Sequence, residues 1–300
     1  MRITTNQTLR SQLASLQANG AAMLRAQETV STQLRVRTIS DDPAAGGTIM
    51  ANSSALRAIG QYRRNVQQAQ SRAGIEDQSL AQATNLLDRA RELAIQGGSD
   101  TTTAAQRLSM GAEVEEILRS LGAIANTAVD GEYFFGGDRG TEQPFTITSG
   151  PGGIDFTTTG AAGMRRVEVG HQQTITPTHD GKTAFIDTGV LAAVRDLARA
   201  FTNPTGNQRD QINGAQVSVQ GAFAQLQGVI GDLGARANTL ELTSANLDAF
   251  ESSLKVFQSD LRDADLESAL TELVSKQTSY QAAMLASQKV LSLNLTDYLR

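Results

Sequence analysis

The feature that most constrains this chain is a repeat of apolar residues in its C-terminal half. Between residues 208 and 262 an apolar residue stands at every seventh position, namely Ile212, Val219, Leu226, Leu233, Leu240, Leu247, Leu254 and Leu261. A strict seven-residue repeat is typical of an α-helix that pairs with other helices in a left-handed supercoil. At about 1.5 Å per residue such a helix is roughly 75 Å long. It therefore needs partner helices of similar length.

Helical partners of suitable length stand earlier in the chain. One helix is expected to begin at Pro43, because Asp42 can cap it and proline fits the first helical position, and to stop at Gly97. Further helices are expected in two ranges, about 103–129 and 190–201. The predicted core of these helices consists of Ile59, Val66, Leu80, Leu87, Ile117, Leu121, Leu226, Leu233, Leu240, Leu247, Leu254 and Leu261.

The two ends of the chain carry weaker repeats. Residues 7–37 and the segment after Asp265 have apolar residues at helical spacing, but glycine or polar residues interrupt each series. Helices with such seams are marginally stable alone and should order only when they pack against partners. Their predicted contact residues are Leu9, Leu13, Leu16, Met23, Val30, Leu34, Leu270, Leu273, Tyr280, Met284, Leu291 and Tyr298.

The composition changes between residues 131 and 188, where glycine and threonine become frequent. Short runs there alternate apolar and polar residues as β-strands do: 146–148, 154–157, 166–169, 174–176 and 184–186. We therefore predict a mainly α protein, an elongated antiparallel coiled-coil bundle built from N- and C-terminal segments with a small central β insert. The predicted parts are a helical rod of 41–130 and 189–264, a β domain of 131–188, and terminal helices of 1–40 and 265–300 that are disordered until assembly.

Composition narrows the classes of function. The formal net charge of -5 provides no basic field for general nucleic-acid binding. The absence of cysteine excludes disulfides and thiolate chemistry. No run of about 18 apolar residues predicts a membrane span, and the first residues lack the apolar core of a cleaved signal peptide. A cytosolic coiled-coil scaffold is the simplest interpretation of these facts.

Few side chains suggest chemistry. His171 and His179 stand near Asp180 and Asp187, but without the spacing of a metal motif, so we expect both histidines to be exposed loop residues. Ser40-Asp41-Asp42 is interpreted as a cap before Pro43 and not as a catalytic group. The sequence therefore predicts no catalytic residue, no metal, no cofactor and no enzyme activity.

Two further features are interpreted as packing. Tyr133, Phe134 and Phe135 are expected to pack where the helices meet the β insert. Five glycines inside the long repeat each cost about 1 kcal/mol relative to alanine, and we interpret them as places where another backbone approaches closely, with a bend as the alternative. These glycines are Gly214, Gly221, Gly228, Gly231 and Gly234.

Several strings in this sequence resemble the flagellin superfamily. They read QLRVRTISDDPAAG from Gln33, RELA from Arg91, LRDADLE from Leu261 and QAAMLA from Gln281. The resemblance covers about 1–137 and 190–300. Within the superfamily, the strings GEYFFGG from Gly131 and LNLTDYL from Leu293 are similar to those of the hook-associated proteins of the hook–filament junction.

The resemblance implies a structural protein of the bacterial flagellum, secreted by the flagellar type III apparatus without a cleaved signal peptide. It also implies an adaptor between a hook-associated protein and the filament. The implied partners are further copies of the chain in a ring of about eleven, the first hook-associated protein, flagellin, and an export chaperone on the C-terminal part. Neither nucleic acid nor a membrane is implied. Filament flagellin and a cytosolic coiled-coil scaffold are the alternatives.

Overall fold

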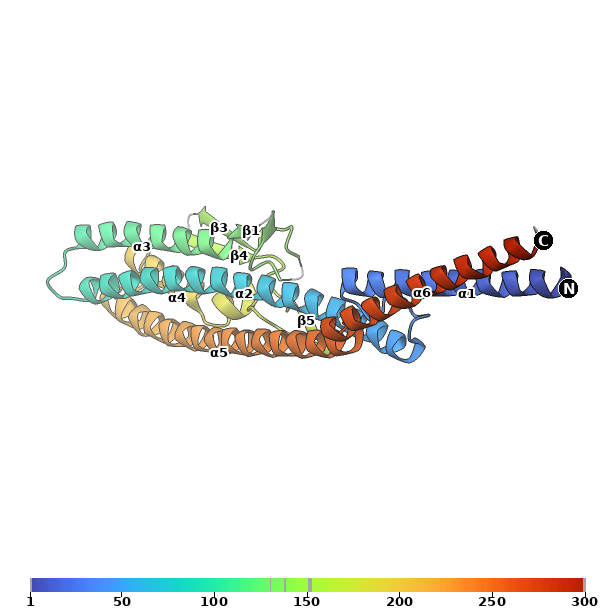
Figure 1. The fold of residues 1–300 in the computed structure, drawn as a ribbon. Helices are drawn as coiled ribbons and strands as arrows, with labels where there is room; N and C mark the ends of the chain where they lie inside the picture. Colours follow the sequence, from blue (N-terminus) through green and yellow to red (C-terminus); the bar gives the residue numbers. More distant parts are fainter. Residues whose placement is uncertain (1, 130, 138, 151–152, 299–300) are drawn as a thin grey trace. The chain divides into compact units, whose positions relative to one another are not determined.

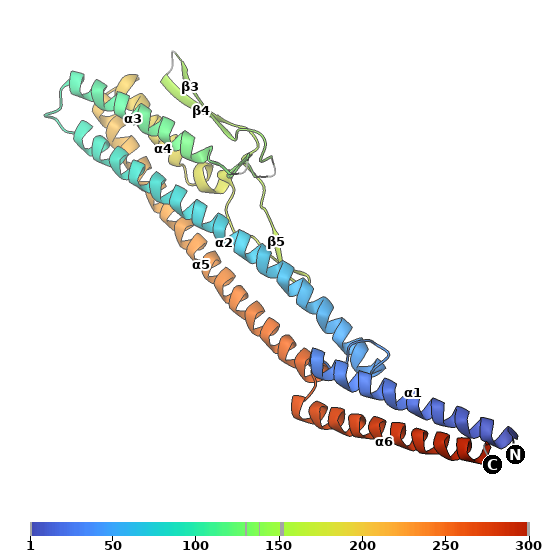
Figure 2. The same ribbon diagram turned by 45° about the horizontal axis from the view of Figure 1, so that its top comes forward.

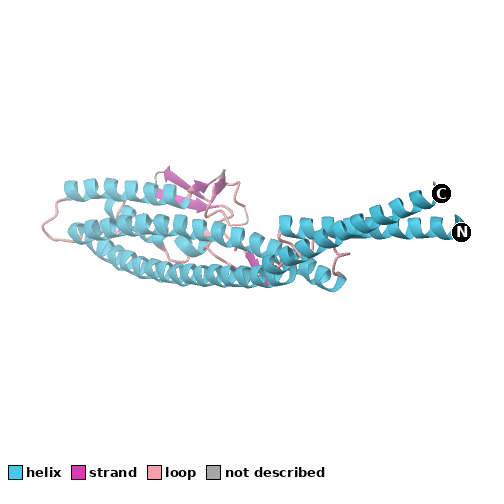
Figure 3. Cartoon of the chain, viewed as in Figure 1, coloured by secondary structure: helices cyan, strands magenta, loops and turns pink. Residues whose placement is uncertain are grey.

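A computed structural model describes residues 2–129, 131–137, 139–150 and 153–298, although the side chains of 1–6, 8–9 and 290–300 lie outside the description. The chain forms two compact units, one of residues 1–58 with 249–300 and one of residues 59–248. Its helices are α1 (Arg2–Thr32), α2 (Pro43–Gly97), α3 (Ala104–Ala125), α4 (Val190–Thr202), α5 (Gln208–Arg262) and α6 (Leu266–Tyr298) (Figures 1 and 3). None of the described helices combines the length and apolarity needed to cross a membrane.

The long helices begin and end where their caps predict, and the mainly α fold is confirmed. The Asp42 carboxylate accepts a hydrogen bond from the Ala45 amide at 3.0 Å, so α2 begins at Pro43. The seven-residue repeat lies entirely within α5. The first helix, α1, stops at Thr32, because Gln33 adopts a left-handed conformation with φ of 58°.

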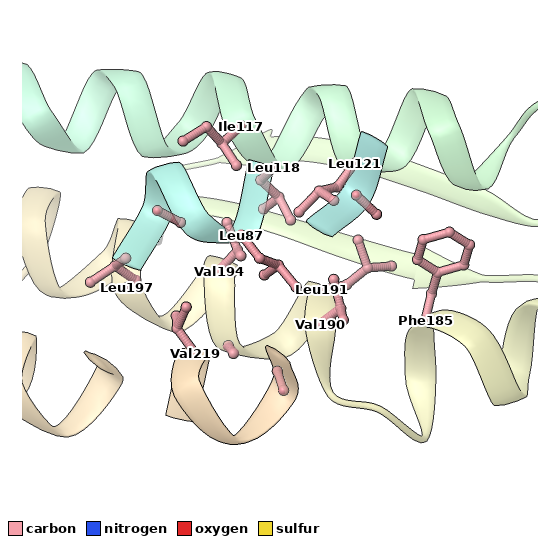
Figure 4. Packing of buried hydrophobic residues seen from close by; sticks show 14 of the residues in the cluster. Leu87, Ile117, Leu118, Leu121, Phe185, Val190, Leu191, Val194, Leu197 and Val219 are labelled. Atoms are coloured by element: carbon pink, nitrogen blue, oxygen red, sulfur yellow. The ribbon is translucent and has the colours of Figure 1, made fainter. Parts of the chain in front are cut away.

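The core of the unit 59–248 lies between α2, α3, α4 and α5 (Figure 4). Leu191, Val194 and Leu197 of α4 are fully buried there, since this short helix turns one apolar face toward all three longer ones. Of the predicted core residues, the structure buries Val66, Leu80, Leu87, Ile117, Leu121, Leu226, Leu233, Leu240 and Leu247. The remaining three, Ile59, Leu254 and Leu261, are half-buried.

Glycines in these helices have two different environments. A Cβ atom on Gly97 would lie 2.3 Å from Cε1 of Phe201, and one on Gly111 would lie 2.8 Å from Cβ of the same residue. Gly97 thus makes room for the buried Phe201 ring, and Gly111 makes room for the Cβ atom of the same residue. The glycines of α5 do not: an added Cβ meets nothing within 4 Å at Gly214, Gly221, Gly228, Gly231 or Gly234. The predicted close approach of another backbone is therefore wrong within the described part of this chain.

The β region consists of antiparallel strand pairs. They are β1 (Ala128–Val129) with β2 (Glu132–Tyr133), β3 (Phe145–Gly150) with β4 (Gly153–Thr158), and β5 (Val167–Gly170) with β6 (Gln173–Ile175). The strand predicted at 184–186 is wrong, because these residues belong to the π-helix η1 (Lys182–Ile186). There Phe185 is buried and makes edge-to-face contacts with Phe135 at 5.0 Å and Phe145 at 5.9 Å between ring centroids. The expected packing of Phe134 and Phe135 is confirmed by their burial.

The β3–β4 pair is fixed to the helices by shape and by charge. Gly122 of α3 faces Ile147 of β3, and a Cβ on that glycine would lie 2.6 Å from the isoleucine Cγ1. Asp155 of β4 forms an ion pair of 2.9 Å with Arg199 of α4. The strands therefore share the helical core.

Candidate assembly surface

The helices α1 and α6 lie side by side in the unit formed by both chain ends (Figure 2). Their facing side chains repeat in steps of four and three residues, as in a coiled coil. On α1 they are Gln12, Leu16, Asn19, Met23, Ala26 and Val30, and on α6 they are Ala269, Leu273, Lys276, Tyr280, Ala283 and Ser287. Small and polar side chains are frequent in both rows, so this seam buries little apolar surface.

The register of this seam differs from the predicted one. Six of the predicted contact residues are half-buried, namely Leu16, Met23, Val30, Leu34, Leu273 and Tyr280. Leu13, Leu270 and Met284 are exposed by 51%, 45% and 43%. The side chains of Leu9, Leu291 and Tyr298 lie outside the described residues. Within the seam, Gly20 provides the space for the predicted contact residue Tyr280, whose Cε2 lies 3.3 Å from where a Cβ on Gly20 would be.

A second apolar row on α6 faces away from α1. Leu270, Val274, Met284 and Leu285 are between 43% and 66% exposed. At about 100° per residue these four positions fall within one sector of roughly 100° on the helix surface. Gln277 and Gln281 fall in the same sector between Val274 and Met284, so the row consists of two exposed apolar patches. Exposed apolar patches of this kind mark a surface for another protein. The structure therefore gives α6 one seam toward its own chain and one that is open.

The segment that follows α1 forms hydrogen bonds with the C-terminal end of α5. The Arg35 amide donates to the Arg262 carbonyl at 2.8 Å, and the Arg35 guanidinium donates to the Leu261 carbonyl at 2.7 Å. An antiparallel bridge joins Leu34 to Asp263. Together these contacts satisfy carbonyl groups that a helix end leaves without partners. Arg35 was not predicted as a functional residue, because its bond to the Leu261 carbonyl spans 226 positions of the sequence.

The turn before α2 is shaped by two carboxylates. Asp41 accepts hydrogen bonds from the Thr38 and Arg37 amides at 2.8 and 3.0 Å, and these bonds lower the pKa of its carboxyl group. The bond from the Ala45 amide, with a smaller effect of Arg35, lowers the pKa of Asp42. Both carboxylates therefore act as turn and helix caps, which explains the Ser-Asp-Asp-Pro string without catalysis.

A buried polar cluster lies in the other unit, around His179. The ring Nδ1 lies 2.7 Å from Oε1 of Glu76, and Nε2 lies 2.9 Å from Oδ2 of Asp232. His179 is only 8% exposed, so the prediction of an exposed loop histidine is wrong for this residue, whereas His171 is exposed. Burial alone would lower the pKa of His179, but the hydrogen bonds and charge of Glu76 and the bond to Asp232 outweigh it, and the pKa is raised.

No local sequence signal identifies this cluster, because Glu76 is 103 positions from His179 and Asp232 is 53 positions away. The helical pattern places Glu76 on the buried face of α2, where an acidic residue needs a partner. An acidic residue on an otherwise apolar helix face is therefore the one sequence feature that could have predicted a buried partner for Glu76. Among the described residues, no group of three or more histidine, aspartate or glutamate side chains is arranged to hold a metal ion.

The amino-acid sequence matches two profiles of one family. Residues 3–139 match the bacterial flagellin N-terminal helical region, and residues 217–299 match the bacterial flagellin C-terminal helical region. The two matches together cover most of the chain and include both α1 and α6. The β5–β6 pair, η1 and α4 lie between them.

Curated relatives come from two groups of flagellar proteins. Flagellar hook-associated protein 3 of Salmonella typhimurium is 28% identical over 174 residues, which are 57% of this chain and 55% of that protein. Flagellin B of Vibrio cholerae is 27% identical over 226 residues, which are 72% of this chain and 57% of that protein. The chain thus spans little more than half the length of these relatives.

Solved structures with the same fold include a provisionally named flagellar hook-associated protein from Vibrio parahaemolyticus. It has a TM-score of 0.66 at 20% identity and covers 74% of this chain and 100% of its own. Flagellar hook associated protein-3 from Legionella pneumophila has a TM-score of 0.63 at 16% identity, with 71% and 98% covered. At these identities the likeness shows that the fold is shared.

Proposed function

The chain belongs to the bacterial flagellin family, and from this premise we propose that it is the structural protein of the hook–filament junction. In this role it is an adaptor on which flagellin assembles, and it has no catalytic activity. The observation that carries the proposal is the open apolar row of α6, Leu270, Val274, Met284 and Leu285, which needs a neighbouring subunit to cover it. The strings GEYFFGG and LNLTDYL and the hook-associated relatives favour the junction over the filament.

We further propose that residues 1–40 and 265–300 become fully ordered only on assembly. The unit that contains them has few buried apolar side chains to stabilise it. Among its described side chains these are Ala26, Val36, Ala45 and Ala269. Three of the four are alanines, which contribute little when they are removed from water. The helical parts 41–130 and 189–264, with the β region 131–188, would then form the part that folds alone.

The proposed partners follow from this role. They are further copies of the chain in a ring of about eleven, the first hook-associated protein on one side, flagellin on the other, and an export chaperone on the C-terminal part. The proposed location is the extracellular flagellum, reached by type III export without a cleaved signal peptide. A chaperone on α6 would cover its open apolar row before assembly, which supports that part of the proposal.

Filament flagellin is the second candidate function. It is favoured by the match to Flagellin B of Vibrio cholerae, which extends over 72% of this chain. A filament protein would use the same open row of α6 to contact copies of itself. The two candidates differ in what the cell loses when the protein is absent.

Deletion of the coding sequence from the source bacterium tests the proposal. A junction protein should leave hooks intact while filaments are absent and flagellin is released into the medium. Electron microscopy of the cells and detection of flagellin in the medium measure this outcome, and re-expression of the full chain is the control. Filaments that persist, or the absence of released flagellin, would contradict the junction function.

A further inference from the structure

The cluster around His179 connects one loop to two helices. His179 follows β6 in the chain, Glu76 belongs to α2, and Asp232 belongs to α5. Arg236, one turn after Asp232, donates to the Asp232 carboxylate at 2.7 Å and to the carbonyl oxygens of Thr176 and Thr178 at 3.1 and 3.3 Å. The loop from residue 176 to residue 181 is therefore fixed to α5 by Arg236 and to both helices by one imidazole ring.

The contacts define the protonation state of that ring. A carboxylate oxygen can only accept hydrogen bonds, and both nitrogens of His179 lie within hydrogen-bond distance of a carboxylate. Glu76 also accepts from the His179 amide at 3.1 and 3.3 Å. Both ring nitrogens must then carry a proton. A neutral ring would direct a lone pair at one of the two carboxylates, of which Glu76 is fully buried and Asp232 is half exposed.

Other charged groups around the ring leave this arrangement intact. His179 borders a cavity of about 340 Å³ whose charged lining residues are Arg72 of α2, Glu132 of β2, Arg165 and Asp180. Arg165 pairs with Glu132 at 3.2 Å. Asp180 accepts from the amides of Thr183 and Gly163 at 2.9 and 3.0 Å. Only Glu76 and Asp232 are hydrogen-bonded to the ring among the described residues, while Arg236 opposes its positive charge.

The loop that the ring fixes also positions the β5–β6 pair. Val169 of β5 is buried in a small cluster with Val66 of α2 and Leu240 of α5. The side-chain amide of Asn65 donates to the Glu168 carbonyl at 2.8 Å. Val167 of β5 and Ile175 of β6 are only partly buried against the same cluster, so the neighbouring loop also helps to hold the strand pair in place.

We propose that Glu76, His179 and Asp232 form a proton-dependent latch, closed while both ring nitrogens of His179 carry a proton and open when one proton is lost. Opening weakens the attachment of the loop 176–181 and the β5–β6 pair to α2 and α5, while the bonds of Arg236 to the Thr176 and Thr178 carbonyls remain. The core around Phe135 and Phe185 does not depend on the latch and stays folded.

The sign of the pH effect follows from the folded state. The pKa of His179 is raised above its ordinary value of about 6.5. The stabilisation is therefore complete below that ordinary value and is lost as the pH rises through the higher value of the folded protein. The latch is closed in mildly acidic solution and opens toward alkaline pH.

Nuclear magnetic resonance on the purified full chain tests the latch. The chain has two histidines, so the exchange of His171 for glutamine leaves His179 as the single imidazole signal. The ¹⁵N shifts of the ring should show protons on both nitrogens at pH 6. Hydrogen exchange at the amides of β5 and β6, corrected for its intrinsic pH dependence, should accelerate over the same pH range in which the ring titrates. Amides of α4 should not change.

Two variants separate the latch from a merely structural role. Asp232→Asn keeps an acceptor atom but removes the charge, and it should shift the His179 titration midpoint to lower pH. His179→Gln should accelerate exchange in β5 and β6 at pH 6 by roughly tenfold or more and remove the pH dependence. Asp187→Asn is the control, because Asp187 is exposed and pairs with Lys182 at 2.8 Å; it should change neither result.

Two outcomes would overturn the latch. One is a His179 titration at or below the ordinary value with unchanged protection of β5 and β6. The other is a pH-dependent loss of protection that persists in His179→Gln, since another group would then be responsible. If His179→Gln does not fold, the titration and exchange of the His171→Gln protein decide the question.

Discussion

At the scale of single residues, glycine has opposite roles in two helices of the same unit. Gly111 of α3 lies against the Cβ atom of Phe201, and its missing side chain leaves room for that residue. Gly221 of α5 faces open space, so in the isolated chain its missing side chain only makes the helix less stable. The same substitution should therefore change stability in opposite directions at the two positions.

Gly111→Ala should destabilise the protein, because the new Cβ would lie 2.8 Å from Phe201 and 2.9 Å from Cγ2 of Thr202. Forcing extra atoms into a packed core costs about 1–3 kcal/mol, less the gain in helix propensity. Gly221→Ala, the matched control in open space, should stabilise the protein by about 0.5–1 kcal/mol. Urea unfolding of the monomer measures both. Equal signs for the two variants would contradict this account.

Residue-scale environments are the part of this structure that the sequence predicted least well. Gly111 and Gly221 are each an isolated glycine inside a helical pattern, and only the neighbouring helix distinguishes them. His179 shows the same limit: its loop resembles an exposed turn, while its partners belong to helices far away in the sequence. Burial of a single residue depends on tertiary contacts, which a local pattern does not contain.

At the scale of elements, α6 is the helix that most directly serves the proposed function. Its seam toward α1 contains Lys276, Tyr280 and Ser287, whereas Leu270, Val274, Met284 and Leu285 are exposed on another face. A helix that stabilises itself places its largest apolar residues toward its own partner. In α6 the apolar residues are divided, with Leu273 and Tyr280 toward α1 and four others exposed, as expected of a helix that also has a partner in another subunit.

Leu285→Asp should prevent incorporation into the flagellum and leave the helix content of the monomer unchanged. The leucine is 66% exposed, so a charge there disturbs little within the chain but would be buried without a partner in an assembly. A motility assay and circular dichroism of the monomer measure the two effects.

Ser279→Asp is the control for Leu285→Asp, because it adds the same charge on the opposite face of the open row. It should leave motility close to that of the unchanged protein. A large loss of monomer helix in Leu285→Asp alone would show that the row stabilises the chain itself.

Element boundaries followed from the sequence wherever a cap determined them. Asp42 with Pro43 and the break at residues 263–265 gave the bounds of α2, α5 and α6. The run Ala184-Phe185-Ile186 misled, because a short apolar run fits a buried strand and a buried helical turn equally well. One row of the seam between α1 and α6 followed from the sequence, with Leu16, Met23, Leu273 and Tyr280, whereas Leu13, Leu270 and Met284 are exposed.

At the scale of the whole molecule, the two units differ in what stabilises them. The unit 59–248 contains a core with the fully buried rings of Phe135, Phe145, Phe185 and Phe201. The unit of both chain ends has mainly alanines in its interior among the described side chains. The unit of both chain ends is therefore stabilised by far less buried apolar area than the unit 59–248.

Limited proteolysis of the purified monomer should remove residues 1–40 and 265–300 first. The unit 59–248 should remain as the resistant fragment, because cleavage follows local opening and its core makes opening rare. Mass spectrometry of the fragments identifies the cleavage sites. Resistance of both ends in the monomer would contradict assembly-coupled ordering. It would leave the proposed junction function to be judged by the deletion experiment.

The bond between Arg35 and the Leu261 carbonyl spans 226 positions of the chain, which has a consequence for the order of folding. Closing so long a loop is entropically costly, but the folded unit 59–248 holds Arg63 and Asp248 in an ion pair of 3.0 Å. Prior folding of that unit shortens the remaining loop and reduces its closure cost by about 1–2 kcal/mol. If the chain emerges from a channel N-terminus first, the first helix therefore cannot pack against α6 until the C-terminal residues have also emerged.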